Sequence, residues 1–367
     1  RGTTEQEALA KMDAERTAFK DAQSSASVYI VKDEFDQIYN REGGSEMNAT
    51  TSQDATTYFI SLPANRIDLW AKMESERLSM PVMRDFYSER DVVKEERRMR
   101  TDNSPIGQLW ELLNATAFTA SPYALPTIGW EADIRNLKAS NAYAFFHKNY
   151  TPDRAVGVIV GDIDVDTTRR LLRETFGKIP PRDPNLPAQH IVPEPPQQRE
   201  RTAILRMQAT PFVMMGWHKP NMPNPADLRA EVLAQALTGG RSSRWFEMFV
   251  KEERIAADLG MFTGPGDAEP NLLNAYGSPQ GDVTLTDLQQ ALHEDIIKLH
   301  DTLIDAGTIE RAKKTLRADT IRALETNMGL ARRLAETAQI SHDPYYLERR
   351  MRQLETITAE VLRDFVR

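Results

Sequence analysis

An internal similarity constrains the fold of this chain more than any other feature of its sequence. FYSERDVVKEERRMR (86–100) matches AGTIERAKKTLRADTIR (306–322) when Glu89 is aligned with Glu310. Further along each half, SPYALPTIGWEADIRNL corresponds to DPYYLERRMRQLETI. One repeat with a period of about 220 residues indicates an internal duplication, because solenoid repeats are roughly 20–50 residues long. The similarity therefore predicts two copies of one α/β unit.

A proline-rich stretch separates the two copies. Residues 181–198 hold six prolines. Such a composition favours an extended, stiff linker with few core residues. The sequence thus predicts a first unit at 1–180, the linker at 181–198 and a second unit at 199–367.

The composition excludes several classes of function. The chain has 367 residues, of which 40% are hydrophobic and 27% charged, and its net charge is −8. No basic stripe of the kind that binds nucleic acid is present, and no apolar run approaches the ~20 residues of a membrane span. The chain has no cysteine, which excludes disulfides and thiol chemistry. The first residues contain no apolar signal core.

The local pattern predicts both helices and strands. Helices are expected at 33–42, 84–101, 284–306 and 308–340, where helix-forming residues and apolar spacing recur. A hairpin is expected over 46–62, turning at Ser52-Gln53-Asp54. Strands are also expected in four further segments, AVGVIVGDID (155–164), TAILRMQA (202–209), FVMMGWHKP (212–220) and LLNAYGSPQG (272–281).

Two glutamates on the predicted helix 84–101 form a candidate metal-binding pair. Glu89 and Glu96 are seven residues apart, which places them within about 20° on one helical face. One carboxylate can then bind a metal directly, and the other can support that ligand from the same helical face. The alternative is a solvated acidic face, the usual role of such a pair. In the second half, Arg317 takes the position of Glu96, so the chain is expected to hold at most one metal site.

Several segments in a fixed order resemble one family. They are FDQIYNREGGSEMNATTSQDATTYFISLP, MESERLSMPVMRDFYSERDVVKEERRMR, SPYALPTIGW, AVGVIVGDID and GWHKP…LTGGRSSRWFEMFVKEERIA. The chain resembles zinc metallopeptidases of the pitrilysin, insulinase and mitochondrial processing peptidase type, the inverted zincins, and among them the bacterial short-chain branch. The resemblance implies an α+β fold of two homologous units. Each unit is a mainly antiparallel sheet covered by helices, and together they form half of a clam-shell chamber.

The resemblance also implies a zinc-dependent endopeptidase that cleaves peptides or unstructured segments inside that chamber. By this resemblance Glu96 is the third zinc ligand and Glu89 supports it, while two histidines and a general-base glutamate come from an H-x-x-E-H motif. The sequence contains no such motif, and its six histidines all follow Glu96. We therefore expect the motif, with the catalytic residues, to lie just before Arg1, and the chain as it stands to be inactive.

Substrate and partner follow from the same resemblance. Met47, Asn48, Ala49 and Thr50 correspond to a substrate-binding edge strand; the alternative is an ordinary hairpin strand. Some members carry an Arg and a Tyr that hold the substrate carbonyl, but Val250 and Ala257 occupy these positions here. A homodimer, or a heterodimer with a homologous subunit bearing the Arg and Tyr, is therefore expected. The expected location is the bacterial periplasm, with the cytoplasm as the alternative.

Three interpretations remain open on the sequence. The chain is a zinc endopeptidase subunit, a non-catalytic scaffold, or a peptide-binding subunit of the same fold. His218, His293 and His300 are interpreted as structural histidines, since the last two are about 10 Å apart along a helix axis. Tyr123, in the SPY segment, is expected to face the chamber.

Overall fold

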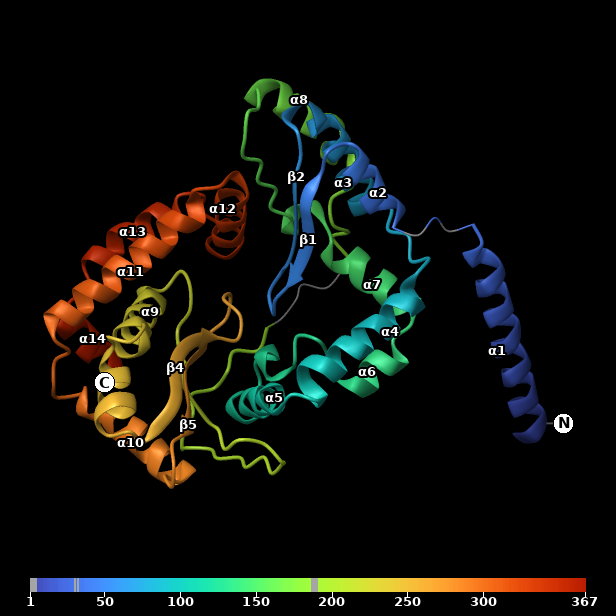
Figure 1. Cartoon of the computed structure of the whole chain (residues 1–367). Coiled ribbons are helices and arrows are strands. Elements are labelled where there is room, and N and C mark those ends of the chain that lie inside the picture. Colours follow the sequence, from blue (N-terminus) through green and yellow to red (C-terminus); the bar gives the residue numbers. More distant parts are fainter. Residues whose placement is uncertain (1–4, 30, 32, 186–190) are drawn as a thin grey trace.

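The computed structural model describes residues 5–29, 31, 33–185 and 191–367, and its first half is mostly helical (Figure 1). A small sheet is formed by β1 (Ser45–Thr51) and β2 (Thr56–Ser61), which pair antiparallel with Asn48 opposite Phe59. The predicted hairpin is therefore confirmed. The helices of this half are α1 (Glu5–Ser27), α2 (Glu34–Arg41), α3 (Ile67–Ser79), α4 (Phe86–Arg97), α5 (Pro105–Ala117), α6 (Glu131–Asn136), α7 (Ala139–Asn149) and α8 (Val165–Glu174).

The second half holds a larger sheet. Strands β3 (Val213–Lys219), β4 (Ala256–Gly264) and β5 (Asn271–Pro279) pair antiparallel in the order β3-β5-β4. The predicted strands at 212–220 and 272–281 are confirmed as β3 and β5. The helices are α9 (Pro225–Thr238), α10 (Leu285–Lys298), α11 (Ala306–Leu324), α12 (Asn327–Ser341), α13 (Tyr346–Glu355) and α14 (Ala359–Val366).

The main hydrophobic core lies in this second half. Its cluster joins α9, α10 and α11 to the sheet and includes the fully buried Trp245, Leu237, Leu288 and Leu292. Burying one leucine side chain contributes roughly 1.5–3 kcal/mol. A second, small cluster of Phe118, Tyr123 and Leu272 brings residues from the first half together with β5.

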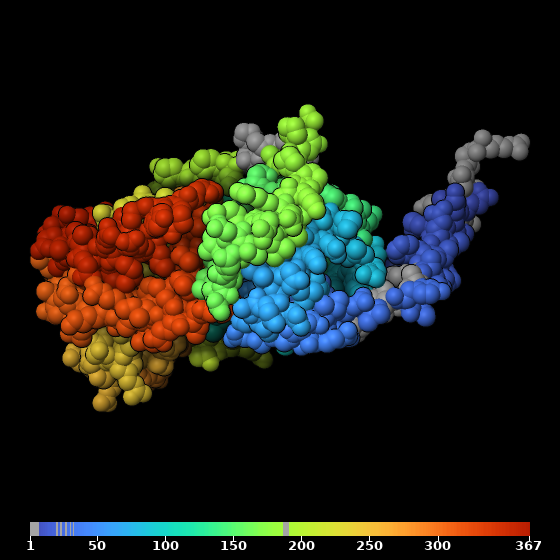
Figure 2. Space-filling model, turned by 90° about the horizontal axis from the view of Figure 1, so that it is seen from above, coloured from blue at the N-terminus to red at the C-terminus, as the bar shows by residue number. Residues whose placement is uncertain are grey.

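The two halves contact each other directly. Helix α5 packs against β3, and α12 packs against β2. Figure 2 shows one continuous body from which α1 projects. We therefore describe the protein as one α+β unit with small antiparallel sheets. The α+β class is confirmed, whereas the division into two homologous units joined by a linker stays a prediction.

Two predicted strands are wrong. The segments 155–164 and 202–209 contain no strand, and Val156 and Ile204 are 45% and 75% exposed. A strand needs a neighbour that accepts and donates its backbone hydrogen bonds. In the part of the chain that the structure describes, neither segment is paired with a strand, although its apolar composition is typical of one.

Three predicted helices have different ends. The helix expected at 284–306 stops at Lys298, the last residue of α10. Helix α4 ends at Arg97 and continues as a π-helical turn (Arg98–Asp102), and the helix expected at 308–340 divides into α11 and α12. The division follows from Thr326, whose side chain accepts a hydrogen bond from Gly329 N and so starts a new helix. Among the described residues, no helix is both long and apolar enough to cross a bilayer.

Candidate functional site

The predicted metal-binding pair lies on α4, a helix whose ends suit its charges. Glu89 lies in the first turn, and Lys94 and Arg97 lie in the last turn. Each charge therefore interacts favourably with the helix dipole. Glu96 is 39% exposed, and its Oε1 lies 2.8 Å from Nη1 of Arg100. Exposed i,i+4 ion pairs of this kind contribute roughly 0–1 kcal/mol. In the aligned position of the second half, Arg317 pairs with Glu355.

The described residues do not make a zinc site. They include no group of three or more His, Cys, Asp or Glu side chains placed to hold a metal. Zinc sites use three or four protein ligands, and one half-exposed carboxylate beside an arginine does not meet that need. The roles assigned to Glu96 and Glu89 therefore stay predictions.

Beside Glu96, Arg97 is buried and fixes the orientation of α4. Its Nη1 donates to Glu111 Oε2 at 2.9 Å and to Gly129 O at 2.6 Å, and its Nη2 donates to Glu111 Oε1. The hydrogen bond that Arg97 donates to Glu111 raises the pKa of Arg97. Sequence reasoning missed this anchor, because an Arg in a charged helical run reads as a solvent-facing residue.

The predicted substrate strand, Met47 to Thr50, has an open edge. In the described chain β1 pairs with β2 alone, and most of its side chains are exposed. In the unbound chain Ala49 N donates to the Asn48 side chain at 2.8 Å, so an added strand has to displace this contact to bond the same N–H. An unpaired edge is a template for an added strand, and sequence alone does not decide whether it is used.

At the tip of this hairpin, Asp54 contacts two distant segments. Tyr123 Oη donates to Asp54 Oδ1 at 2.8 Å, and the backbone N of Asp267 and of Ala268 donate to Asp54 Oδ2 at 2.7 and 3.2 Å. Tyr123 is 1% exposed, so the expectation that it faces an open chamber is wrong. Its ring is enclosed because its hydroxyl is already used by the turn and the β4–β5 loop.

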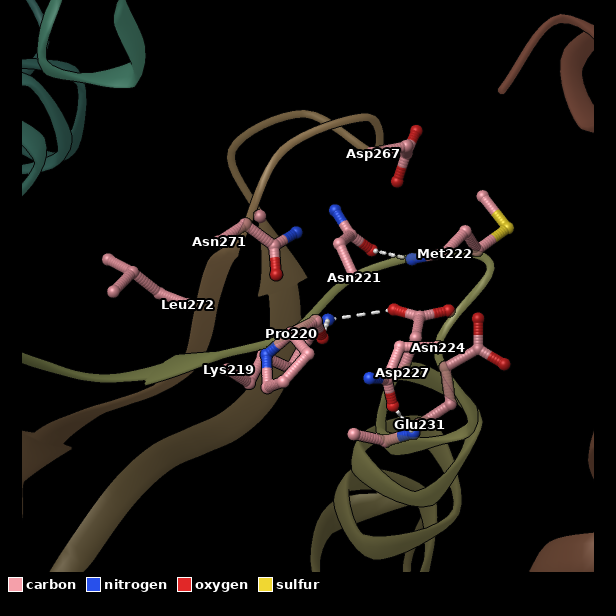
Figure 3. Close-up of polar contacts among 12 residues, drawn as sticks. Lys219, Pro220, Asn221, Met222, Asn224, Asp227, Glu231, Asp267, Asn271 and Leu272 are labelled. Atoms are coloured by element: carbon pink, nitrogen blue, oxygen red, sulfur yellow. Dashed lines mark hydrogen bonds and ion pairs between the residues drawn. The ribbon is translucent and has the colours of Figure 1, made fainter. Parts of the chain in front are cut away.

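A buried charge network lies below that loop (Figure 3). Lys219, at the end of β3, places Nζ 2.7 Å from Asp227 Oδ1, and Arg350 from α13 places Nη1 2.8 Å from Asp227 Oδ2. Arg350 also pairs with Glu231 at 3.0 Å. Both oxygens of Asp227 thus face cations, so the group acts as a structural junction rather than as a base.

Asp267 lies close to this network. Burial, followed by the nearby carboxylates of Asp227 and Asp54, raises the pKa of Asp267. A perturbed carboxyl of this kind is a feature of functional sites, although structural networks also produce it.

The prediction that His218 is a structural histidine is confirmed. Its Nε2 lies 3.1 Å from Ala117 O, and its ring meets Phe118 edge to face at 5.2 Å. Burial lowers the pKa of His218, so the neutral ring is favoured. Arg201 donates to the same Ala117 carbonyl at 2.9 Å, which makes this an anchor for the C-terminal end of α5.

The comparisons with known proteins point to one family. The family profile described as Peptidase M16 inactive domain matches residues 136–316. The zinc protease PqqE of Helicobacter pylori is 30% identical over 303 residues, which is 81% of this chain and 68% of the relative. A protein of Mycobacterium leprae, named an uncharacterized zinc protease, is 26% identical over 330 residues, covering 86% of this chain and 71% of the relative.

A solved structure agrees with these sequence matches. The crystal structure of a protease from Helicobacter pylori matches with a TM-score of 0.83 and 27% identity, over 91% of this chain and 81% of that one. The chain belongs to the M16 peptidase family. The resemblance to pitrilysin-type zinc metallopeptidases is thereby confirmed.

Proposed function

We propose that this chain is a non-catalytic, peptide-binding member of the M16 family. The observation that carries the proposal is the open edge of β1 in a molecule whose described residues hold no group of three metal-ligating side chains. The match of residues 136–316 to the profile described as an inactive domain supports it.

The binding mode is addition of an extended peptide to β1. Main-chain hydrogen bonds to the free edge give affinity with little dependence on sequence, and pockets for alternate side chains give specificity. Met47, Asn48, Ala49 and Thr50 are the residues proposed to receive the peptide. Folded proteins expose few unpaired strands, so the substrate class is unstructured peptide segments.

A partner chain completes the site in this proposal. The two halves of the chain form half of a clam-shell chamber, and a second homologous chain, identical or different, closes it. Val250 and Ala257 have no side-chain hydrogen-bond donor, so the partner supplies the Arg and Tyr that hold a substrate carbonyl. The family match supports this arrangement.

The test compares binding with cleavage. A fluorescein-labelled casein fragment is mixed with the protein, binding is followed by fluorescence anisotropy, and the peptide is then analysed by mass spectrometry with and without added zinc. We expect saturable binding and an intact peptide in both cases. Zinc-dependent fragments would refute the non-catalytic assignment, and absent binding would refute the peptide-binding role.

A pair of variants at Ala49 tests the binding mode. Proline is tolerated on edge strands but removes the backbone N–H, whereas glycine keeps it. We therefore expect Ala49→Pro to raise the Kd for the casein fragment about tenfold, because at least one main-chain hydrogen bond is lost. Ala49→Gly should change the Kd less than about threefold. Equal affinities of the two variants would contradict binding at this edge.

A second candidate function is zinc-dependent peptide hydrolysis. The names of the relatives and the seven-residue spacing of Glu89 and Glu96 favour it. It needs the H-x-x-E-H motif that this sequence does not contain. In a gene product that carries the motif, Glu96→Gln is expected to reduce zinc content sharply, as measured by plasma mass spectrometry. Unchanged zinc and unchanged cleavage would exclude Glu96 as a ligand.

A further inference from the structure

Three segments that are distant in sequence meet at the tip of the β1–β2 hairpin. Besides donating to Asp54, Tyr123 Oη accepts hydrogen bonds from Ala268 N at 3.1 Å and Glu269 N at 2.9 Å. Asp54 accepts from Asp267 N and Ala268 N. We call Asp54, Tyr123 and residues 266–269 the clasp. It contains no basic side chain, so backbone N–H groups and one hydroxyl balance the Asp54 carboxylate.

The clasp is closely packed. At Gly266, which has φ of +65°, a Cβ atom would lie 2.4 Å from the Tyr123 ring and 2.7 Å from the Asp54 carboxylate, so a larger residue is excluded. The loop is also held from below, because Asn221 and Asn271 both donate to Gly266 O, at 3.2 and 2.7 Å (Figure 3). The loop therefore offers Asp54 a fixed set of donors.

Helix α12 holds the same hairpin from another side. The guanidinium of Arg332 lies 4.4 Å from the centre of the Phe59 ring on β2, and Gln339 Nε2 donates to Asp54 O at 3.4 Å. In Figure 1 the tip of the hairpin points toward the β4–β5 loop, with α12 beside β2. The hairpin belongs to the first half of the chain, yet its position is set by the second half.

We infer that Asp54 and Tyr123 are positioning residues that hold the open edge of β1 in place for an extended peptide. The inference rests on the proposed function. A two-stranded hairpin alone is marginally ordered, so a peptide that adds to it must also order it. With the tip fixed, that ordering is complete before binding, and the peptide binds more tightly for the same contacts.

The test uses Tyr123→Phe in the full chain, with Tyr345→Phe as the matched control, because Tyr345 is an exposed tyrosine outside the clasp. The probe is the fluorescein-labelled casein fragment, measured well below the melting temperature. We expect Tyr123→Phe to raise Kd about fivefold and to speed hydrogen exchange at residues 45–51, with Tyr345→Phe unchanged in both. A normal Kd together with normal exchange in Tyr123→Phe, with or without a lower melting temperature, would overturn the inference.

A second variant, Asp54→Asn, distinguishes failure of the proposed function from failure of this inference. Asp54→Asn keeps one acceptor oxygen, so we expect an effect between wild type and Tyr123→Phe, and the double variant should be no worse than Tyr123→Phe alone. Additive effects on Kd would overturn the clasp as a unit. If the wild type does not bind the fragment, the proposed function fails. If Tyr123→Phe does not fold, the Asp54→Asn result decides, and wild-type affinity there overturns the inference.

Discussion

Glu194 shows at the scale of one residue how the proline-rich stretch is fixed to the body. Its carboxylate accepts hydrogen bonds from the backbone N of Thr119, Ala120 and Ser121 at 2.8–3.0 Å and from Thr119 Oγ1 at 2.8 Å. These donors outweigh the cost of partial burial and lower the pKa of Glu194 to about 2. A residue in a predicted linker thus contacts the segment just after α5.

Replacing Glu194 with Gln tests this contact. We expect Glu194→Gln to lower the free energy of unfolding by about 1–3 kcal/mol at pH 7, because charged acceptors form the stronger hydrogen bonds. Urea denaturation measures it, with Glu200→Gln as the exposed control. No loss of stability in Glu194→Gln relative to that control would contradict the contact.

The stability difference between wild type and Glu194→Gln should also depend on pH. The pKa of Glu194 is lower in the folded protein than the ordinary value of 4.5, so its contribution is present above about pH 4.5 and disappears as the pH falls toward about 2. The difference in unfolding free energy between wild type and Glu194→Gln should therefore shrink across this range. A difference that stays constant from pH 5 to pH 2.5 would show that the charge is not involved.

At the scale of elements, the β4–β5 loop depends on a close approach at Gly266. We expect Gly266→Ala to destabilise the protein by about 2–4 kcal/mol, from a left-handed backbone plus a clash with Tyr123. Gly281→Ala is the matched control, since Gly281 has φ of +61° with open space around it, and should cost only about 1 kcal/mol. Chemical denaturation of both variants isolates the clash, and equal losses would contradict it.

Helix α10 offers a test of the core. Leu292 is fully buried, whereas Leu285 on the same helix is 36% exposed. We expect Leu292→Ala to cost about 2–5 kcal/mol of unfolding free energy and Leu285→Ala less than about 1 kcal/mol. Thermal and urea unfolding measure both. A similar cost at the two positions would mean that α10 does not pack as described.

Local sequence predicts elements well where the pairing partner is also local. The β1–β2 hairpin was predicted, since alternation and turn residues are read directly. Strands β3 and β5 were also predicted, from their apolar composition, although they pair with each other across a long sequence separation. Strand β4 was missed, because it contains Gly260, where a Cβ atom would lie 2.5 Å from the Tyr276 ring of the neighbouring strand. The segment 155–164 was wrongly assigned to a strand, since its composition says nothing of whether a neighbour is available.

The residues of the candidate site were likewise predicted only where they lie within one element. The E-x6-E spacing on α4 and the edge strand were found in the sequence because each lies within one element. The clasp was not, since Asp54 lies 69 residues from Tyr123 and 213 residues from Asp267, separations that no local pattern encodes. The SPY segment gave the one usable signal, and it predicted an exposed Tyr123 where the structure buries it.

At the scale of the whole molecule, the second half carries the core and holds the hairpin of the first. The charge junction at Asp227 fixes β3, α9 and α13 together, and the β4–β5 loop extends from that frame to Asp54. The peptide-binding edge proposed for β1 is therefore held in place by contacts with the second half.

Hydrogen exchange of β1 tests the central claim most directly. The exchange rates of residues 45–51 are compared with and without a saturating unlabelled casein fragment. We expect these amides to exchange more slowly when the peptide is present, and the recovered peptide to be intact. Unchanged exchange at β1, with protection appearing elsewhere in the chain, would contradict the proposal that this strand binds peptides.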